Sequence, residues 1–429
     1  MRRLLVLAAI AGCTRSTSTA PSPVARIASS PPPSTADAGA SVESPPPSPA
    51  ACAPAVVDTI DDGEGVLSPT GSMDLGDVQV IADGDRIGVS WTRHSNFLYG
   101  DSWRSPNFAS RVDGTWKQVK LPTLAYACAL YGAAAVNTIE RPFVSWGVAN
   151  NGSFEVFDHL PALKDALDIV PAHSKPVAEV TTPRQTVDHF VVSRNVALAM
   201  LFENACEPSC LCASPKKSIS FWVRRLEPAR SSAQRVSLMY EYDDKAGAPA
   251  IAMGEHGGIV AYRARSKLHL AWLDADGRPL TASPAVEFDS GDVGAPAVAM
   301  AGDEAIVVWA RRASKDDAYQ LRSLRLTHGA SPGAPASIPT AGSAFAPSVV
   351  ADAGHVTLAW MEGDGGRHGE IHVARSLTGP SVVVSGDETN ARDPELSGDP
   401  SSPAIVWQSF TKERMAGVIK VARLDCRDR

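Results

Sequence analysis

The sequence has no excess of positive charge and no long apolar run. Its 429 residues include 40 Lys and Arg against 47 Asp and Glu, which gives a formal net charge of −7. Because phosphate binding needs clustered Lys and Arg, we predict no nucleic-acid partner. A membrane-spanning helix needs about 18 or more apolar residues in a row, and the sequence contains no such run. Apolar residues make up 44% of the chain, which is enough to bury a core over most of its length.

Motifs of catalysis and metal binding are also missing. No G-x-S-x-G nucleophile elbow stands out in the sequence, and it has no helical H-E-x-x-H element. The acidic run 58–65, DTIDDGEG, lacks the spacing of a calcium loop, and we interpret it as a solvated turn. His368 and His372 would face the same way on a strand, so a metal pair is conceivable, but we favour one loop and one strand histidine. We therefore assign no catalytic residue, no metal and no cofactor.

The first residues indicate secretion. Arg2 and Arg3 precede the apolar run 4–12, LLVLAAIAG, a pattern typical of a signal peptide. The following Ile10-Ala11-Gly12-Cys13 resembles the lipobox of bacterial lipoproteins. That resemblance implies removal of residues 1–12, lipidation of Cys13, and a membrane partner reached through the lipid. An ordinary signal peptide that happens to contain Cys13 is the alternative.

The resemblance to lipoproteins also bears on location. Acylation with two or more chains gives stable anchoring, so we expect a protein of the cell envelope. Thr14 follows the cysteine, and in enterobacterial lipoproteins an Asp at that position causes retention at the inner membrane. Because position 14 is not Asp, the resemblance implies the outer membrane. The domain would then be either periplasmic or exposed at the surface.

Residues 13–53 form a linker rich in Pro, Ser and Ala. This segment includes two triple-proline runs, at 31–33 and 45–47, and has no aromatic residue. Such a composition cannot bury enough apolar surface to offset the entropy of ordering, so we predict a disordered tether. We expect either a spacer that lifts the domain off the membrane or a linker with no tuned length.

The remaining segment, 54–429, is repetitive. Four copies align without gaps, each with an interval of 13 residues between a proline and an aromatic residue. The copies run from Pro249 to Tyr262, Pro296 to Trp309, Pro347 to Trp360 and Pro394 to Trp407. Each contains two apolar runs separated by a polar turn, which predicts a β-hairpin. Three weaker copies end at Trp91, Trp146 and Phe202.

A third β-type run follows every hairpin, and several units have a fourth, such as 115–121, 278–283 and 380–385. Four antiparallel strands repeated seven times predict an all-β fold, a single seven-bladed β-propeller with four-stranded blades. A tandem of β-sandwiches is the alternative. The last unit stops at its third strand, so we expect residues 55–60 to supply its outer strand and leave no blade incomplete.

Cysteine spacing agrees with this closure. Without Cys13 six cysteines remain, an even number in an oxidising compartment. Cys52 precedes the proposed closing strand and Cys426 follows its expected partner, so we predict a Cys52–Cys426 disulfide. Two further disulfides are expected among the remaining cysteines, which are Cys128, Cys206, Cys210 and Cys212. A metal site on the last three is the alternative, although their spacing differs from that of usual zinc pairs.

The repeat resembles the sialidase-like and other bacterial extracellular β-propellers over residues 55–425, although no Ser-x-Asp-x-Gly-x-x-Trp box is present. The richest predicted loop, 93–107, carries ligand-binding candidates, namely Phe97, Tyr99, Trp103 and Arg104. These side chains could instead pack the loop onto its blade.

We interpret the protein as a lipid-anchored, non-enzymatic module that binds or scaffolds an envelope protein or polysaccharide. A glycan hydrolase or lyase with its site at the central opening is the alternative. A structural surface protein without a discrete ligand is a third possibility.

Overall fold

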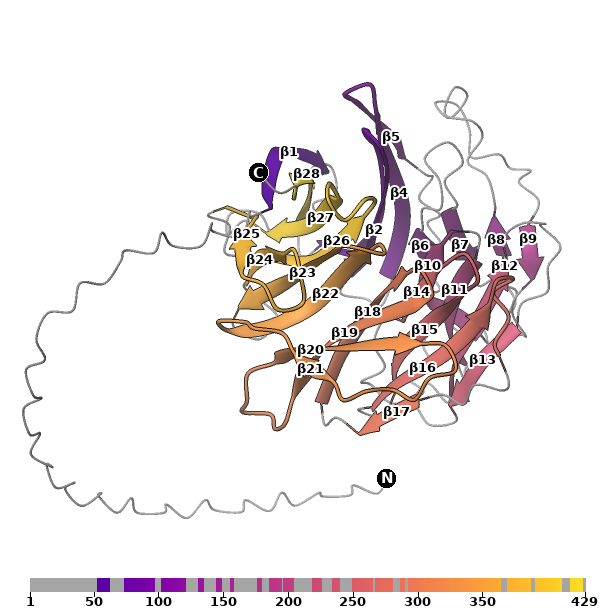
Figure 1. Cartoon of the computed structure of the whole chain (residues 1–429). Helices are drawn as coiled ribbons and strands as arrows, with labels where there is room; N and C mark the ends of the chain where they lie inside the picture. Colours follow the sequence, from indigo (N-terminus) through magenta and orange to yellow (C-terminus); the bar gives the residue numbers. More distant parts are fainter. Residues whose placement is uncertain are drawn as a thin grey trace, which may run out of the picture. The chain divides into compact units, whose positions relative to one another are not determined.

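The computed structural model describes strands and their turns in the unit Pro49–Arg429 (Figure 1). The described residues are 52–61, 73–96, 102–120, 130–134, 144–148, 155–157, 176–179, 185–194, 196–203, 218–225, 234–239, 249–264, 267–280, 286–289, 292–363, 369–386, 390–410 and 417–426. All regular elements in these ranges are β-strands. Among them no helix is long and apolar enough to cross a membrane.

Six antiparallel four-stranded sheets make up most of the described residues. The sheet nearest the N-terminus contains β2 (Met73–Asp83), β3 (Arg86–Asn96), β4 (Ser102–Val112) and β5 (Thr115–Lys120). Next along the chain comes the sheet of β10 (Gln185–Ser193), β11 (Val196–Glu203), β12 (Ser218–Arg225) and β13 (Gln234–Met239). It is followed by β14 (Ala250–Met253), β15 (Gly257–Ala264), β16 (Lys267–Asp274) and β17 (Val286–Asp289).

Three further four-stranded sheets follow along the chain. One contains β18 (Asp292–Ala301), β19 (Glu304–Arg312), β20 (Gln320–Thr327) and β21 (Ala336–Ser337). The next contains β22 (Ser343–Ala351), β23 (Val356–Gly363), β24 (Gly369–Ala374) and β25 (Ser381–Val383). The last contains β26 (Ala391–Ser397), β27 (Ala404–Phe410), β28 (Gly417–Asp425) and, from the other end of the chain, β1 (Ala53–Asp61).

Two smaller two-stranded sheets lie between β5 and β10 in the sequence. One pairs β6 (Leu130–Ala134) with β7 (Val144–Val148), and the other pairs β8 (Glu155–Phe157) with β9 (Pro176–Glu179). Strands β7 and β8 are in contact, as are β4 and β6, and β6 and β10. These residues therefore connect the first four-stranded sheet with the second.

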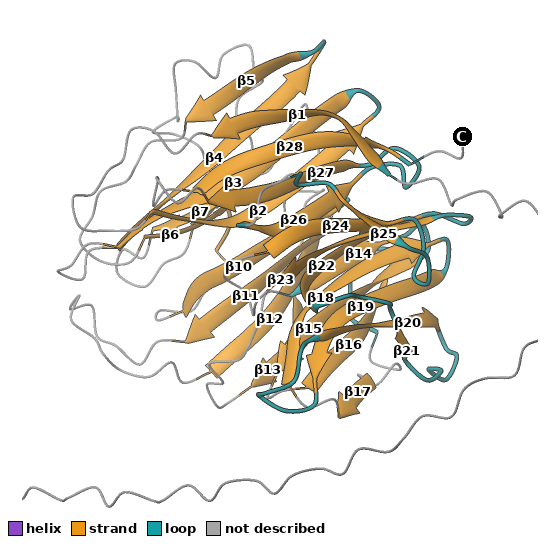
Figure 2. Cartoon of the chain, turned by 90° about the vertical axis from the view of Figure 1, so that its left-hand side faces the viewer, coloured by secondary structure: helices purple, strands orange, loops and turns teal. Residues whose placement is uncertain are grey.

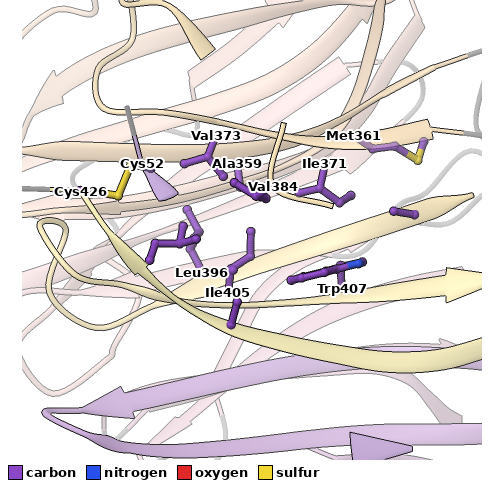
Figure 3. Packing of buried hydrophobic residues seen from close by; sticks show 13 residues of the cluster. Cys52, Ala359, Met361, Ile371, Val373, Val384, Leu396, Ile405, Trp407 and Cys426 are labelled. Carbon is purple, nitrogen blue, oxygen red and sulfur yellow. A yellow bond between two sulfur atoms is a disulfide. The ribbon is translucent and has the colours of Figure 1, made fainter. Parts of the chain in front are cut away.

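The predicted aromatic residues whose side chains are described fill the spaces between neighbouring sheets. Trp91, Trp309, Trp360 and Trp407 are among the largest fully buried side chains, and each lies on the second strand of its sheet. Each packs against the preceding sheet: Trp407, for example, shares a cluster with residues of β23 and β24 (Figure 3). Trp91 joins a cluster with β27 and β28, so the first and last sheets also pack together. A large residue per repeat is needed because twisted sheets leave a gap that only a large side chain fills.

The first strands of these sheets share an irregularity close to the repeat proline. Register shifts occur between Val293 and Pro296, between Phe345 and Ser348, and between Arg392 and Glu395. A bulge bends the strand and changes the direction of the side chains that follow it. In the last sheet the bulge places Asp393 in the left-handed region, with a φ of 51°.

Closure by the N-terminal strand is confirmed. β1 pairs antiparallel with β28, from Ala53 opposite Asp425 to Asp61 opposite Ile419. The predicted Cys52–Cys426 disulfide is present and joins residues 374 positions apart in the sequence (Figure 3). The outer strand missing from the last repeat is therefore supplied by the start of the domain.

Two sequence predictions about strands are corrected. The fourth strand of the third four-stranded sheet is β17 at Val286–Asp289, not 278–283. Residues 278–280 follow a turn in which the Asp274 carboxylate accepts hydrogen bonds from the amides of Asp276 and Arg278, and Pro279 forms an isolated bridge with Leu273. Residues 281–283 lie outside the described residues. In the acidic run, residues 58–61 belong to β1 rather than to a turn, and residues 62–65 lie outside the described residues.

Candidate functional site

The two ends of each four-stranded sheet differ in their connections. Tight turns join the first and second strands at one end, as at 84–85 and 302–303, and we call this the turn end. At the opposite end, the site end, the first strand begins and the second strand ends. Turn ends of neighbouring sheets lie together, since His256 Nδ1 is 2.9 Å from Asp303 Oδ1 (Figure 2).

A partly buried carboxyl group joins the last two sheets at their first strands. Ser348 on β22 donates its hydroxyl proton to Glu395 Oε2 on β26, at 3.0 Å, and the same hydroxyl oxygen accepts from the Leu396 amide at 2.9 Å. The pKa of Glu395 is raised to about 7, mainly by burial; the Ser348 hydrogen bond lowers it and the nearby charge of Asp393 raises it. Near neutral pH this group can both hold and release a proton.

A second carboxylate lies two residues before Glu395, at the bulge. The side chain of Asp393 is more than half exposed, and its Oδ2 lies 3.8 Å from Arg392 Nε. Gln408 on β27 donates from Nε2 to the same oxygen at 3.3 Å. Gln408 is buried, and its Oε1 has no hydrogen-bond partner among the described residues. In the last sheet an exposed carboxylate at the bulge thus lies two residues before a partly buried acid in the middle of β26.

A separate polar network occupies the site end of the sheet β18–β21. Asp292 Oδ2 accepts hydrogen bonds from Arg312 Nε at 2.8 Å and from the Tyr319 hydroxyl at 2.8 Å. The Arg312 guanidinium lies 4.7 Å from the centre of the Tyr319 ring. Burial raises the pKa of Tyr319, and its hydrogen bond to Asp292 raises it further. Because Asp292 is satisfied by both partners, this network orders the strand ends.

One sheet, β22–β25, lies between the polar network and the sheet of Glu395. The Tyr319 and Phe345 rings are 4.6 Å apart, and Phe345 lies on β22 three residues before Ser348. In that same sheet, Glu362 near the end of β23 accepts a hydrogen bond from Trp360 Nε1 at 2.9 Å. Asp, Glu, Arg and Tyr side chains therefore come from the site ends of three consecutive sheets.

The loop predicted as a ligand-binding element is shorter than expected. β3 continues to Asn96 and β4 begins at Ser102, so most of 93–107 is paired strand. Trp103 lies opposite Ser95 and Arg104 opposite His94 in this ladder, although neither side chain is among those described. The hydrogen bonds of the ladder join backbone groups, so they do not depend on apolar alternation, which this polar segment lacks. Phe97 and Tyr99 lie outside the described residues.

Other predicted site residues have different outcomes. His372 lies on β24, as expected of a strand histidine, with its ring stacked on Trp360 at 5.6 Å. His368 lies outside the described residues, as do the lipidation candidate and four of the disulfide candidates: Cys13, Cys128, Cys206, Cys210 and Cys212. In the described part of the chain, no three His, Cys, Asp or Glu side chains group as a metal site.

Sequence analysis missed Glu395, although a signal was present. The residue after the repeat proline is Ala250, Ala297, Ser348 or Glu395 in the four aligned copies. Three of these residues are small, so a glutamate on an inner strand departs from the pattern. Buried charged residues without a role in the core are uncommon, which makes this position a functional candidate.

Comparisons with known proteins identify no family. No protein-family profile matches the sequence, and no curated protein matches it. The chain is similar in structure to an α-L-arabinanase of Penicillium chrysogenum complexed with arabinobiose, with 9% identity, a TM-score of 0.46, and coverage of 87% of this chain and 98% of that chain.

Two further solved structures are similar over a smaller part of their own length. A mutant sialidase of Trypanosoma rangeli has 8% identity and a TM-score of 0.41, over 88% of this chain and 57% of that chain. A prolyl endopeptidase has 13% identity and a TM-score of 0.42, over 79% of this chain and 47% of that chain. Structural similarity at these identities and TM-scores assigns neither a substrate nor functional residues to this chain.

Proposed function

We propose that this chain is a lipid-anchored envelope protein whose seven-bladed propeller acts on a glycan, as a hydrolase or lyase, with Glu395 as the acid. The Glu395–Ser348 hydrogen bond, which is partly buried and joins two sheets, is the observation that carries the proposal. It favours the enzymatic alternative over the non-enzymatic module, because Asp, Glu, Arg and Tyr side chains from several sheets lie at corresponding strand ends.

The seven-bladed arrangement is part of this proposal. Six blades correspond to the four-stranded sheets, and we assign β6, β7, β8 and β9 to the seventh. Contacts between first strands support a ring: β2 touches β6 and β26, and β18 touches β14 and β22. Closing the ring leaves no sheet with an unpacked face.

The chemistry proposed for Glu395 follows from its environment. A carboxylic acid with a pKa of about 7 is still largely protonated at slightly acid pH, and it can donate that proton to a departing glycosidic oxygen. Asp393, which is exposed and ionised, would activate water in a hydrolase or remove a proton in a lyase. Ser348 holds the acid through one carboxylate oxygen.

A turnover assay with a matched pair of variants tests the proposal. The purified domain is incubated with envelope polysaccharides, and new reducing ends and unsaturated products are measured. We expect Glu395→Gln to abolish turnover and Glu304→Gln to leave it unchanged, because Glu304 lies at the turn end, paired with Arg325. Turnover that survives in Glu395→Gln contradicts the assignment of the acid.

One observation favours the binding module as a second candidate. The paired β3 and β4 extend to Asn96 and Ser102, which places Trp103 and Arg104 on an ordered ladder. Aromatic and Arg side chains are common among the residues that contribute most to binding energy. Crosslinking capture from intact envelopes tests this, with a variant in which Phe97, Tyr99, Trp103 and Arg104 are all Ala. A partner retained by that variant would rule out the loop as its binding surface.

A further inference from the structure

The N-terminal segment joins the described fold at its turn end. Cys52 directly precedes β1, and the first pair of the ladder is Ala53 opposite Asp425. The Cys426 amide donates to the Ser401 carbonyl, at 2.9 Å, in the connection between β26 and β27. Asp393 and Asp292 lie near the beginnings of first strands, at the opposite end. Cys52, where the tether is attached, and the two aspartates are thus at opposite ends of the sheets.

We propose that the Cys52–Cys426 disulfide carries tension between the N-terminal tether and an immobile glycan partner at the site end, so that β1 stays paired while the protein links the two. This inference rests on the proposed function for the nature of the partner and of the anchor. The position of the bond within the fold is the observation behind it.

The disulfide lies ahead of β1 on the path of any pull from the tether. Tension applied at residue 51 reaches the Cys52 side chain before it reaches the first hydrogen-bonded pair of β1. Through Cys426 it passes to β28, which is paired on both sides, with β1 and β27. Without the bond, the same tension would fall on the β1 ladder alone.

The far side of the bond is firmly held. Cys52 and Cys426 are both buried, in a cluster that includes Val384, Leu396 and Ile405 (Figure 3). The Leu424 amide donates to the Pro403 carbonyl at 2.9 Å, which fixes the end of β28 to its own sheet. Force entering at Cys426 is therefore shared by the packed junction of the last two sheets.

Beyond its backbone ladder with β28, β1 makes few stabilising contacts. Its side chains Val56 and Val57 are 60% and 41% exposed, and its register shifts twice within nine residues. Asp58 accepts from Trp116 Nε1 at 2.9 Å and lies 3.6 Å from Arg111 Nε, at a partly exposed position. Because β1 buries little apolar surface and has a partly exposed ion pair, we expect it to be the first element to detach when the Cys52–Cys426 disulfide is absent.

Single-molecule stretching of the purified domain tests this without any ligand. One handle is attached to the N-terminal tether and the other, through a bio-orthogonal group, to the exposed Lys315 in the loop at the site end. We expect the oxidised wild type to unfold without an earlier rupture. The double variant Cys52→Ser, Cys426→Ser should show an added early rupture at lower force, from loss of β1. After complete unfolding the wild type should also remain shorter, because the bond shortens the path between the handles.

A second pair of handles distinguishes two effects of removing the disulfide: loss of the bond that bears the tension, and a general loss of stability of the domain. Handles at Asp303 and Lys315 exclude β1 from the path, and with them we expect the same rupture force for wild type and variant. An early rupture in both proteins, or in neither, would overturn the proposal, as would equal weakening with both handle pairs. Lipidation of Cys13 and glycan turnover are measured separately, so failure of the proposed function does not decide this test.

Discussion

The Ser348 hydroxyl and the Glu395 carboxyl group form a hydrogen bond of 3.0 Å between the first strands of neighbouring sheets. The two residues are 47 positions apart, and each follows the proline of its repeat. The repeat pattern therefore places equivalent positions of successive sheets side by side. In the last two sheets these equivalent positions are Ser348, a hydrogen-bond donor, and Glu395, a carboxylic acid.

The stability of the protein should decrease as pH rises through the pKa of Glu395. Burial raises this pKa from 4.5 to about 7, so the folded state binds a proton that the unfolded state releases between these values. The stabilisation is complete below about pH 4.5 and lost above about pH 7, and it amounts to roughly 3 kcal/mol at most. Urea unfolding of wild type and Glu395→Gln at several pH values measures it. Parallel pH dependence in both proteins would contradict this account.

Ser348→Ala should weaken the junction and change the acidity of Glu395. The Leu396 amide and the Glu395 carboxyl group both lose a partner, which costs about 1–3 kcal/mol for buried groups. Because the serine hydrogen bond lowers the pKa of Glu395, its removal should raise that pKa. Carboxyl titration by NMR and urea unfolding test both effects. Ser337→Ala is the control, since Ser337 is exposed; an unchanged pKa would assign Ser348 a packing role only.

Asp292→Asn should lower the pKa of Tyr319. The hydrogen bond and the charge of Asp292 both raise this pKa, although burial contributes most. Without the charge, the phenol should ionise closer to its ordinary value. Ultraviolet titration of tyrosine detects the shift, and Tyr319→Phe identifies the signal. If Asp292→Asn leaves the tyrosine titration unchanged, the charge of Asp292 does not influence the pKa of Tyr319.

Trp407→Ala should cost about 3–5 kcal/mol of unfolding free energy, because it empties a site between two sheets. Trp407 is 1% exposed and packs among residues of β23 and β24. Denaturant unfolding measures the loss, with Val383→Ala as the control because Val383 is 40% exposed. Similar losses in the two variants would argue against a special role for the repeat aromatic residue.

Removal of the Cys52–Cys426 bond should destabilise the domain. The chain-entropy model predicts a loss on the order of 5 kcal/mol for so long a loop, as an upper estimate. Unfolding of Cys52→Ser, Cys426→Ser against wild type measures it, and non-reducing peptide mapping verifies the pairing. Recovery of Cys52 in a peptide linked to any other cysteine would refute the closure.

The sequence by itself determined most of the described strands, the repeat, the buried aromatic residues that are described and the pairing of β1 with β28. These features follow from local alternation, turn residues and a constant interval, all of which can be read along the chain. The Cys52–Cys426 bond was predicted from the same pattern. The last repeat lacks an outer strand, and if residues 55–60 supply it, the two cysteines that flank the paired strands come together.

Only the tertiary structure decided which side chains meet at the site end. The Glu395–Ser348 bond joins different sheets, so it depends on how those sheets pack rather than on any local pattern. The network of Asp292, Arg312 and Tyr319 likewise depends on where three strands end. The extension of β3 and β4 through a polar segment could not be predicted, because backbone pairing does not require the apolar alternation by which strands are recognised in a sequence.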